Sequence, residues 1–227
     1  MARRLTIAAL FVVLLSTAFA HAQNLEAVLN AMDKAAANFR TAQTDFAWDQ
    51  YQKVVDEHDN QKGTMYFRRQ SDDVEMAADI TDPEKKYVLF NGGMVSVYLP
   101  KAGQVTEYNA RKNKADFETF LVLGFGGRGH DLEKSFDVKY AGMEQVQGIN
   151  AGKLELTPKS QKVSNMFQTI TLWIDMARGV SVQQLFNERS GDYRLAKYTN
   201  IKVNEKINND VFKLKTSGKV TYVRPNG

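Results

Sequence analysis

The sequence predicts a single α+β domain, built on an antiparallel sheet that folds toward a barrel or a sandwich. Short stretches of aromatic, β-branched and alternating residues recur from Gln43 to Val223, and turn residues separate them. This spacing is typical of antiparallel sheets. Two further segments, near the start and in the middle of the chain, have helical spacing. No repeat, low-complexity tract or linker divides the chain, so one domain is the economical interpretation.

The first residues, Met1 to Ala22, have the features of a removable secretory signal peptide. Two arginines precede an uncharged apolar run from Leu5 to Ser16, and either Ala20 or Ala22 could end the leader. The run is shorter than the roughly 20 residues that a membrane-spanning helix needs. We therefore expect cleavage rather than a retained anchor, and residues 23–227 as the mature domain.

The composition excludes several classes of chemistry. The chain of 227 residues contains no cysteine, which excludes disulfides, thiolate metal sites, cysteine nucleophiles and the acylated cysteine of a lipoprotein. Lysine and arginine number 30 against 26 acidic residues, and the two signs are interspersed along the chain. That mixture is typical of a solvated surface, so we expect no nucleic-acid partner.

An amphipathic helix is expected directly after the leader, from Asn24 as its cap to about Arg40. Its apolar residues recur at steps of three and four and form one stripe: Leu25, Val28, Leu29, Met32, Ala36 and Phe39. Charged and amide side chains lie opposite. Such a helix must cover an apolar surface, and a sheet is the expected one.

A meander of strands follows the helix. The hairpin turn at Asn91-Gly92-Gly93 is its strongest signal, because these residues accept positive φ at little cost. A polar turn is also expected at His58 to Gly63. The expected strands are Gln43–Val55, Thr64–Arg69, Val74–Ile80, Tyr87–Phe90, Met94–Leu99 and Gln104–Asn109.

The middle of the chain predicts a short helix and a mobile connection. Asp116 to Leu123 has helical spacing, and the glycine-rich stretch Gly124 to Gly129 follows it. This stretch matches G-x-G-x-x-G, but a dinucleotide site requires a preceding strand, so we interpret it as a loose loop. The glycines would let the apolar segment before them move.

Strands are expected again in the second half: Ser135–Ala141, Lys153–Thr157, Thr169–Asp175, Val180–Asn187 and Tyr193–Tyr198. A turn at Asn208 to Asp210 follows them and precedes a last strand near Lys219–Val223.

No catalytic constellation is evident in the sequence. His21, His58 and His130 are far apart, and the spacing predicts no close cluster of histidine with carboxylates. No Gly-x-Ser-x-Gly elbow is present to hold a serine nucleophile. We therefore expect no enzyme activity, no metal and no cofactor.

The strand Thr64 to Arg69 poses a question about one arginine. Alternation places Met65, Phe67 and Arg69 on one face, so an inward-facing Phe67 implies an inward-facing Arg69. Burying its donors is costly unless they find acceptors. Alternatively, Arg69 lies at the strand end and reaches water along its stem. Alternation alone leaves both interpretations open.

Several motifs occur in a characteristic order along the mature chain. They are Gly63–Arg69, Asn91–Gly93, Tyr98–Pro100, Leu154–Lys159 and Asn209–Leu214, followed by Gly218–Val220. In their order and spacing the chain resembles the periplasmic outer-membrane lipoprotein carrier family of the LolA type, over nearly all of its mature length.

The resemblance implies an incomplete, strongly bent antiparallel β-barrel, with short helices forming a lid over an apolar cavity. It implies a soluble periplasmic carrier, expected as a monomer, that moves lipoprotein acyl chains from the inner to the outer membrane. Its partners would be an inner-membrane lipoprotein-releasing transporter and an outer-membrane acceptor. The alternative is a periplasmic sensor or regulator of lipids or lipoproteins on the same fold.

The resemblance and the strand alternation together predict the site. Arg69 falls where the family has an arginine that bonds to lid backbone, which implies a latch. We expect the acyl cavity to be lined by Met65, Phe67, Val74, Met76, Leu89, Val95, Val97, Phe117, Phe120 and Leu121. Whether the cargo is a lipoprotein, a free lipid or a glycolipid stays open at this point.

Overall fold

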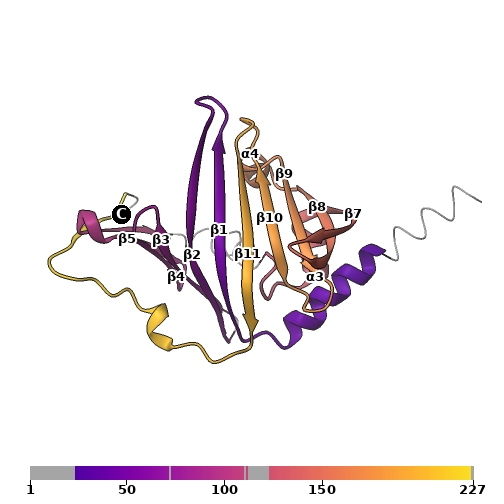
Figure 1. Cartoon of the computed structure of the whole chain (residues 1–227), viewed down its shortest axis with the longest axis horizontal. Helices are drawn as coiled ribbons and strands as arrows, with labels where there is room; N and C mark the ends of the chain where they lie inside the picture. The colour runs from indigo at the N-terminus through magenta and orange to yellow at the C-terminus, as the bar shows by residue number, and fades with distance from the viewer. Residues whose placement is uncertain (1–23, 72, 110, 112–122, 226–227) are drawn as a thin grey trace, which may run out of the picture.

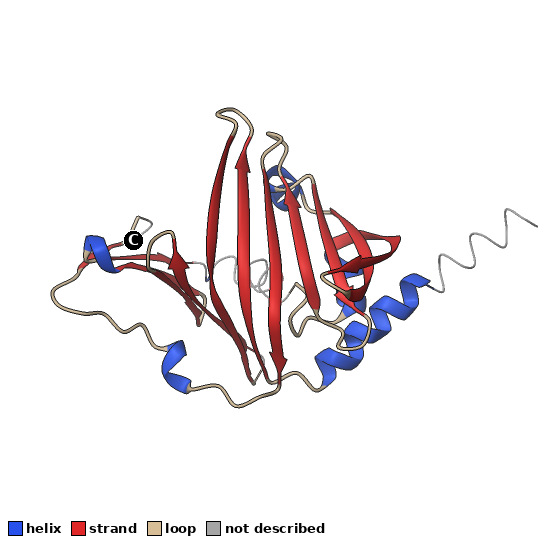
Figure 2. Ribbon diagram, viewed as in Figure 1, coloured by secondary structure: helices blue, strands red, loops and turns tan. Residues whose placement is uncertain are grey.

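The computed structural model describes residues 24–71, 73–109, 111 and 123–225. The expected signal peptide and most of the helix expected at Asp116 to Leu123 lie outside this part of the chain. The described residues form one strongly curved twelve-stranded sheet (Figures 1 and 2). It is not closed, because β12 lies at one edge and β7 at the other. The expected incomplete, bent β-barrel is thus confirmed.

The strands run in the order β12-β6-β5-β4-β3-β2-β1-β11-β10-β9-β8-β7, and only the β12–β6 pair is parallel. Their bounds are β1 Thr41–Gln52, β2 Glu57–Gln70, β3 Asp73–Asp82, β4 Lys86–Asn91, β5 Met94–Leu99, β6 Gln104–Asn109, β7 Phe136–Val146, β8 Ile149–Pro158, β9 Thr169–Asp175, β10 Ser181–Asn187, β11 Tyr193–Val203 and β12 Thr221–Val223.

Two meanders of neighbouring strands make up most of the sheet. β1 to β6 form the first, β7 to β11 form the second, and the antiparallel pairing of β1 with β11 joins them. Short helices lie in the connections: η1 (Pro100–Ala102), α3 (Gly129–Ser135), α4 (Gln161–Met166) and η3 (Asn209–Phe212). Neither α3 nor α4 was expected from the sequence, because each is about two turns or less and lacks a repeating apolar stripe.

The N-terminal helix, residues 24–37, covers one wing of the sheet, as its stripe predicts (Figure 1). Val28, Leu29 and Met32 are buried in one cluster with the inner residues of β8 and β9, Leu154 and Leu172 among them. The helix approaches the sheet closely, since a side chain at Gly152 would lie 2.5 Å from Val28 Cγ2. It ends before the expected Arg40, whose carbonyl accepts from the Arg69 backbone N–H at 2.8 Å.

The prediction of a polar turn at His58 to Gly63 is wrong. These residues belong to β2, and the hairpin turn lies at residues 53–56, where Asp56 has φ 53°. β1 pairs with β2 as far as Gln52 and Glu57, beyond the part of the sheet that is covered. Both faces of the hairpin are exposed to water there, so polar residues are suitable on either face. Backbone pairing with β1, rather than burial of side chains, stabilises this part of β2.

The glycine-rich stretch after Leu123 is not the loose loop that we expected. Residues 123–126 are buried, and Gly126, at φ 84°, lies against the Phe39 ring, where a Cβ would approach Cδ1 within 2.5 Å. At Gly129 an added Cβ would lie 2.4 Å from the carbonyl oxygen of Leu29. Here glycine permits close packing on the N-terminal helix and a positive φ, rather than motion.

The C-terminal segment, residues 204–220, crosses the convex face of β2, β3 and β4 before β12 pairs with β6 (Figure 1, yellow). Phe212 in η3 is buried against this face. The sheet is therefore covered on both sides, by the N-terminal helix on the concave side and by the C-terminal segment on the convex side. No helix in the described residues is long and apolar enough to cross a bilayer.

Candidate functional site

The concave face of the sheet encloses an apolar cavity of about 380 Å³, which we call the concave hollow. It lies between the first meander, α4, and the ends of β10 and β11. Its apolar lining consists of Trp48, Met65, Phe67, Met76, Val88, Phe90, Val95, Leu123, Phe125, Val163, Met166, Phe167, Phe186 and Tyr198. The volume falls in the range of roughly 300–1,000 Å³ that is typical of small-molecule sites.

Aromatic rings form the floor of the concave hollow. The Phe67 ring stacks on Phe125 with centroids 4.8 Å apart, and Phe125 meets Tyr198 edge to face at 5.0 Å. Phe125 belongs to the glycine-rich stretch, so the packing of Gly124 and Gly126 sets the position of this ring. Methionines from β2 and β3 adjoin the floor, and their flexible side chains suit a site that admits variable chains.

The structure brings only part of the predicted cavity residues together. Met65, Phe67, Met76 and Val95 line the concave hollow. Val74 shares the face of Met76 in β3, and Val97 shares that of Val95 in β5, but neither is among the described lining residues. Phe117, Phe120 and Leu121 lie outside the described part of the chain.

The prediction for Leu89 is wrong, because this side chain lies on the other face of the sheet. In the β3–β4 register Phe90 is opposite Met76, and Leu89 is opposite Ala77. Phe90 therefore faces the concave hollow, while Leu89 lines a pocket on the convex side. Because Tyr87, Val88, Leu89 and Phe90 are all apolar or aromatic, alternation within β4 could not identify the inward face.

Several lining residues were not predicted. The β1–β11 register places Trp48 and Tyr198 beside buried residues. This could be seen only once these two strands, which are far apart in the sequence, were known to pair. Phe90 could have been found from the β3–β4 hairpin register. Val163 and Met166 lie on α4, which has no counterpart among the expected elements.

Arg69 holds together the elements that border the concave face. Its Nη1 donates to the carbonyl of Ala36 in the N-terminal helix at 3.1 Å, and its Nη2 donates to that of Gly126 at 2.5 Å. The guanidinium also lies 5.7 Å from the centroid of the Phe39 ring. The inward interpretation of Arg69 therefore holds, and the acceptors that such an arginine requires are backbone carbonyls.

Polar groups also reach the concave hollow. The Tyr198 hydroxyl donates to Gln184 Oε1 at 3.0 Å, and Gln184 Nε2 donates to the Leu123 carbonyl at 2.5 Å. Burial raises the pKa of the Tyr198 phenol far above its usual range, so it stays a neutral donor. Arg194 and Lys162 are the charged residues among the described lining.

A histidine and two carboxylates pin the N-terminal helix to α3, in a cluster that was not expected from the sequence. His130 Nδ1 lies 2.6 Å from Asp33 Oδ2, and His130 Nε2 lies 3.3 Å from the Glu26 carboxylate. The hydrogen bond that His130 donates to Asp33 raises the pKa of the His130 imidazole. The histidine and its partners are far apart in the sequence, so only the folded chain joins them. His58 likewise lies 2.6 Å from Asp49.

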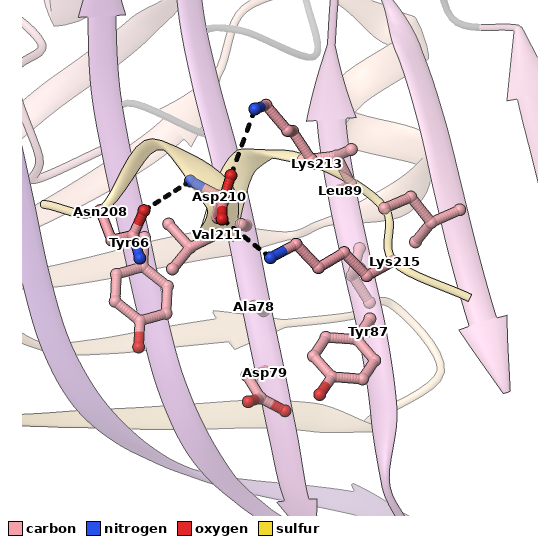
Figure 3. A pocket seen from close by; sticks show the side chains of 13 residues that line it. Tyr66, Ala78, Asp79, Tyr87, Leu89, Asn208, Asp210, Val211, Lys213 and Lys215 are labelled. Atoms are coloured by element: carbon pink, nitrogen blue, oxygen red, sulfur yellow. Dashed lines mark hydrogen bonds and ion pairs between the residues drawn. The ribbon is translucent and has the colours of Figure 1, made fainter. Parts of the chain in front are cut away.

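A second cavity, of about 260 Å³, lies on the opposite face beneath the C-terminal segment (Figure 3), and we call it the convex pocket. Tyr66, Asp79 and Tyr87 line it from the strands. Asp210 spans its rim and accepts from Lys213 at 3.2 Å and Lys215 at 2.9 Å. Burial raises the pKa of the Asp79 carboxyl, whose Oδ1 has no hydrogen-bond partner among the described residues.

Metal chemistry has no evident place in either cavity. Among the described residues, no three histidine, aspartate or glutamate side chains are arranged so that they could hold one metal ion. The concave hollow offers apolar walls and a few nitrogen donors. This arrangement can bind an acyl chain and orient its polar end.

Comparisons with known proteins agree with this geometry. The family model described as "Outer membrane lipoprotein carrier protein LolA" matches residues 37–215. None of the curated proteins compared matches the chain.

Among solved structures, the crystal structure of MucB has a TM-score of 0.54 at 15% identity, and the match covers 85% of this chain and 63% of that one. The chain thus spans less than two thirds of MucB. An uncharacterized conserved protein from Thermus thermophilus has a TM-score of 0.55 at 12% identity, covering 86% of this chain and 96% of that one. At these identities the similarity concerns the fold.

Proposed function

Because the chain belongs to the LolA family of outer membrane lipoprotein carrier proteins, we propose that it carries the acyl chains of lipoproteins from the inner to the outer membrane. The cargo chain would lie in the concave hollow. Members of this family are carriers or binding proteins, and the family is periplasmic.

The observation that carries this proposal is the composition of the concave hollow. Apart from Lys162, Gln184 and Arg194, every described lining residue is apolar or aromatic. Each methylene removed from water contributes about 0.8 kcal/mol, so a chain of a dozen or more carbons has a strong driving force for entry. No catalytic group is needed for that task.

Release of the cargo requires that a wall of the hollow can open, and we assign the latch to Arg69. Its two bonds to backbone carbonyls close the N-terminal helix and the glycine-rich stretch over the concave face. Both acceptors are main-chain oxygens, which do not titrate. Charge-assisted bonds of this kind are strong enough to hold a wall closed and few enough to be broken by cargo or by a partner.

The proposal includes the expected partners and place of action. An inner-membrane transporter would load the carrier, an outer-membrane acceptor would receive the cargo, and the leader at Met1 to Ala22 would direct export to the periplasm. A monomer suffices for this role, because the described hollow is built by one chain.

A sensor or regulator of lipids or lipoproteins is the second candidate. The similarity to the complex of MucA and MucB from Pseudomonas aeruginosa favours it, with a TM-score of 0.51 at 16% identity and coverage of 85% of this chain and 61% of that one. A carrier transfers its ligand to a second membrane, whereas a sensor binds its ligand and then changes its interaction with another protein. Transfer of the ligand to a membrane therefore distinguishes the two functions.

The experiment is to express the full chain with its leader, purify the exported protein and analyse an organic extract by mass spectrometry. We expect acylated lipoprotein in the extract, and not in that of an exported protein of unrelated fold purified in parallel. The loaded protein is then mixed with outer-membrane vesicles, to which a carrier transfers its cargo. An extract without acylated species would contradict the proposal, and retained cargo would favour the sensor.

A further inference from the structure

We propose that the acyl ligand of the concave hollow carries a negatively charged head group, which Arg194 recognises together with the indole N–H of Trp48. The inference rests on the acyl-binding role proposed for the hollow and extends it to a second class of ligand, because the ester- and amide-linked chains of a lipoprotein carry no free carboxylate or phosphate. The head-group chemistry is that of a carboxylate or a phosphate on an alkyl chain.

Two buried donors without acceptors carry the inference. Arg194 Nε and Trp48 Nε1 are both inaccessible to water, and neither has a hydrogen-bond partner in the described part of the chain. Both residues line the concave hollow. Leaving such donors unpaired is costly, so their presence in one cavity indicates a ligand that supplies acceptor oxygens.

The two donors are neighbours. Trp48 is opposite Ala196 in the β1–β11 register, two residues along β11 from Arg194, so both side chains lie on the concave face. The Arg194 guanidinium carbon lies 5.7 Å from the centroid of the Trp48 ring. Stacking of this kind holds a guanidinium in place while its N–H groups stay available.

The charge of the hollow favours an anion. Arg194 lines the hollow and makes no ion pair with any described residue. No carboxylate is among the described lining residues. An anion there would replace the water that Arg194 loses on burial, and in an apolar cavity this attraction is screened little by salt.

The position of Arg194 also defines the orientation of the ligand. Arg194 is the second residue of β11, paired with Phe186 in β10, and both residues line the hollow with α4. Phe67 and Phe125 form its aromatic floor. We place the head group at the α4 end and the alkyl chain over the two phenylalanine rings. The Tyr198 hydroxyl is already bound to Gln184 and is not needed by the head group.

The test compares ligands with the same alkyl chain and different charge. Laurate, dodecyl phosphate and methyl laurate are titrated at pH 8 into the exported full chain, delipidated beforehand, with tryptophan fluorescence as the readout because Trp48 lines the hollow. Arg194→Gln and Arg194→Lys are measured in parallel, and thermal unfolding verifies that each variant is folded.

We expect laurate or dodecyl phosphate to bind the wild type at least about ten-fold more tightly than methyl laurate. Arg194→Gln should abolish this preference by weakening the two charged ligands at least about ten-fold more than methyl laurate, and Arg194→Lys should recover part of it. Tighter binding of the phosphate would identify a phospholipid-like ligand, and tighter binding of the carboxylate a fatty acid.

Equal binding of charged and neutral ligands by the wild type would overturn the inference and leave the proposed acyl site intact. So would an Arg194→Gln variant that weakens all three ligands alike. If none of the three binds, the proposed acyl site fails together with the inference. The two failures are therefore distinguishable.

Discussion

The two cavities lie on opposite faces of the same strands and differ in size, charge and covering. The concave hollow, about 380 Å³, is mostly apolar and contains Arg194, whose Nε has no partner among the described residues. The convex pocket, about 260 Å³, contains the carboxyl of Asp79, flanked by Tyr66 and Tyr87. Since neighbouring residues of a strand point to opposite faces, one stretch of sequence builds two unlike environments.

The same contrast applies to two consecutive arginines in β2. Arg69 binds carbonyls of the N-terminal helix and the glycine-rich stretch on the concave side. Arg68 donates to Asn209 Oδ1 at 2.7 Å on the convex side, pairs with Glu75, and lies 4.3 Å from the centroid of the Phe212 ring. Each arginine thus fastens one end of the chain to one face. Of the two faces, the concave side is the one that encloses an apolar hollow.

The largest difference between the faces should follow from truncating an apolar side chain on each. Phe67→Ala removes a buried ring of the concave floor, and we expect a loss of about 3 kcal/mol in the free energy of unfolding. Acyl binding should fall at least about ten-fold, because the stacked partner Phe125 loses its support. Urea unfolding and laurate titration measure the two effects.

Leu89→Ala is the matched control, since Leu89 lies in the same sheet but lines the convex pocket. We expect about 1 kcal/mol of destabilisation for this half-buried residue and unchanged laurate affinity. Equal losses of affinity in the two variants would show that the concave hollow is not where the acyl chain binds.

A smaller effect is expected from replacing each of the two arginines of β2 separately. Arg69→Leu removes two charge-assisted bonds and keeps an apolar stem, so we expect local opening of residues 28–37 to become easier by about 2 kcal/mol. Amide hydrogen exchange in the N-terminal helix should then be roughly 30-fold faster.

Arg68→Leu provides the comparison for this latch. It should accelerate exchange near η3, at residues 209–213, and leave the N-terminal helix as protected as in the wild type. A latch role for Arg69 is untenable if its variant retains wild-type protection in the helix and wild-type retention of bound lipid.

The smallest expected difference between the two faces is in how the stability contributed by one residue on each face depends on pH. His130 Nδ1 donates to the Asp33 carboxylate on the concave side, and that hydrogen bond raises the pKa of His130 above its usual value of 6.5. Its stabilisation is therefore complete below pH 6.5 and is lost as pH rises through the raised pKa. For the Asp33 carboxyl, burial opposes the effect of His130, but the net shift lowers its pKa, so it stays ionised in this range.

We therefore expect the destabilisation caused by His130→Asn to be larger at pH 6 than at pH 8, measured by urea unfolding at both. Asp210→Asn is the control on the convex side. Bonds from Lys215 and Lys213 lower the pKa of Asp210 below 3.8, so its contribution is lost only as pH falls through that lower value. Its effect should be equal at pH 6 and pH 8. Equal destabilisation by His130→Asn at pH 6 and pH 8 would contradict the role assigned to the His130–Asp33 hydrogen bond.

Local patterns in the sequence predicted most of the sheet. β5, β6 and β9 begin and end at the expected residues, and for β5 the flanking turn residues Gly93 and Pro100 explain why. The inward face of β2 was predictable as well, since polar and apolar residues alternate there. β4 was not, because four consecutive apolar or aromatic residues fit either face. Sheet register decided the matter, placing Phe90 inward.

Features that depend on distant contacts could not be predicted. The loop that we expected to be mobile is buried because the N-terminal helix packs against its glycines. The pairing of His130 with Asp33 joins α3 to a helix that precedes it by many residues. Trp48 and Arg194 meet only because β1 pairs with β11. Each of these contacts is a consequence of the folded topology.

The seam between β1 and β11 also has a consequence for how fast the chain folds. Each meander assembles from neighbouring strands, but the seam joins residues such as Thr44 and Thr199, whose separation is 155 residues. Contacts of such long range must close a large loop before they gain any energy, and they slow folding accordingly. We expect formation of the seam to be rate-limiting. Until it forms, β1 and β11 are exposed strand edges, and the newly made chain is most prone to aggregation.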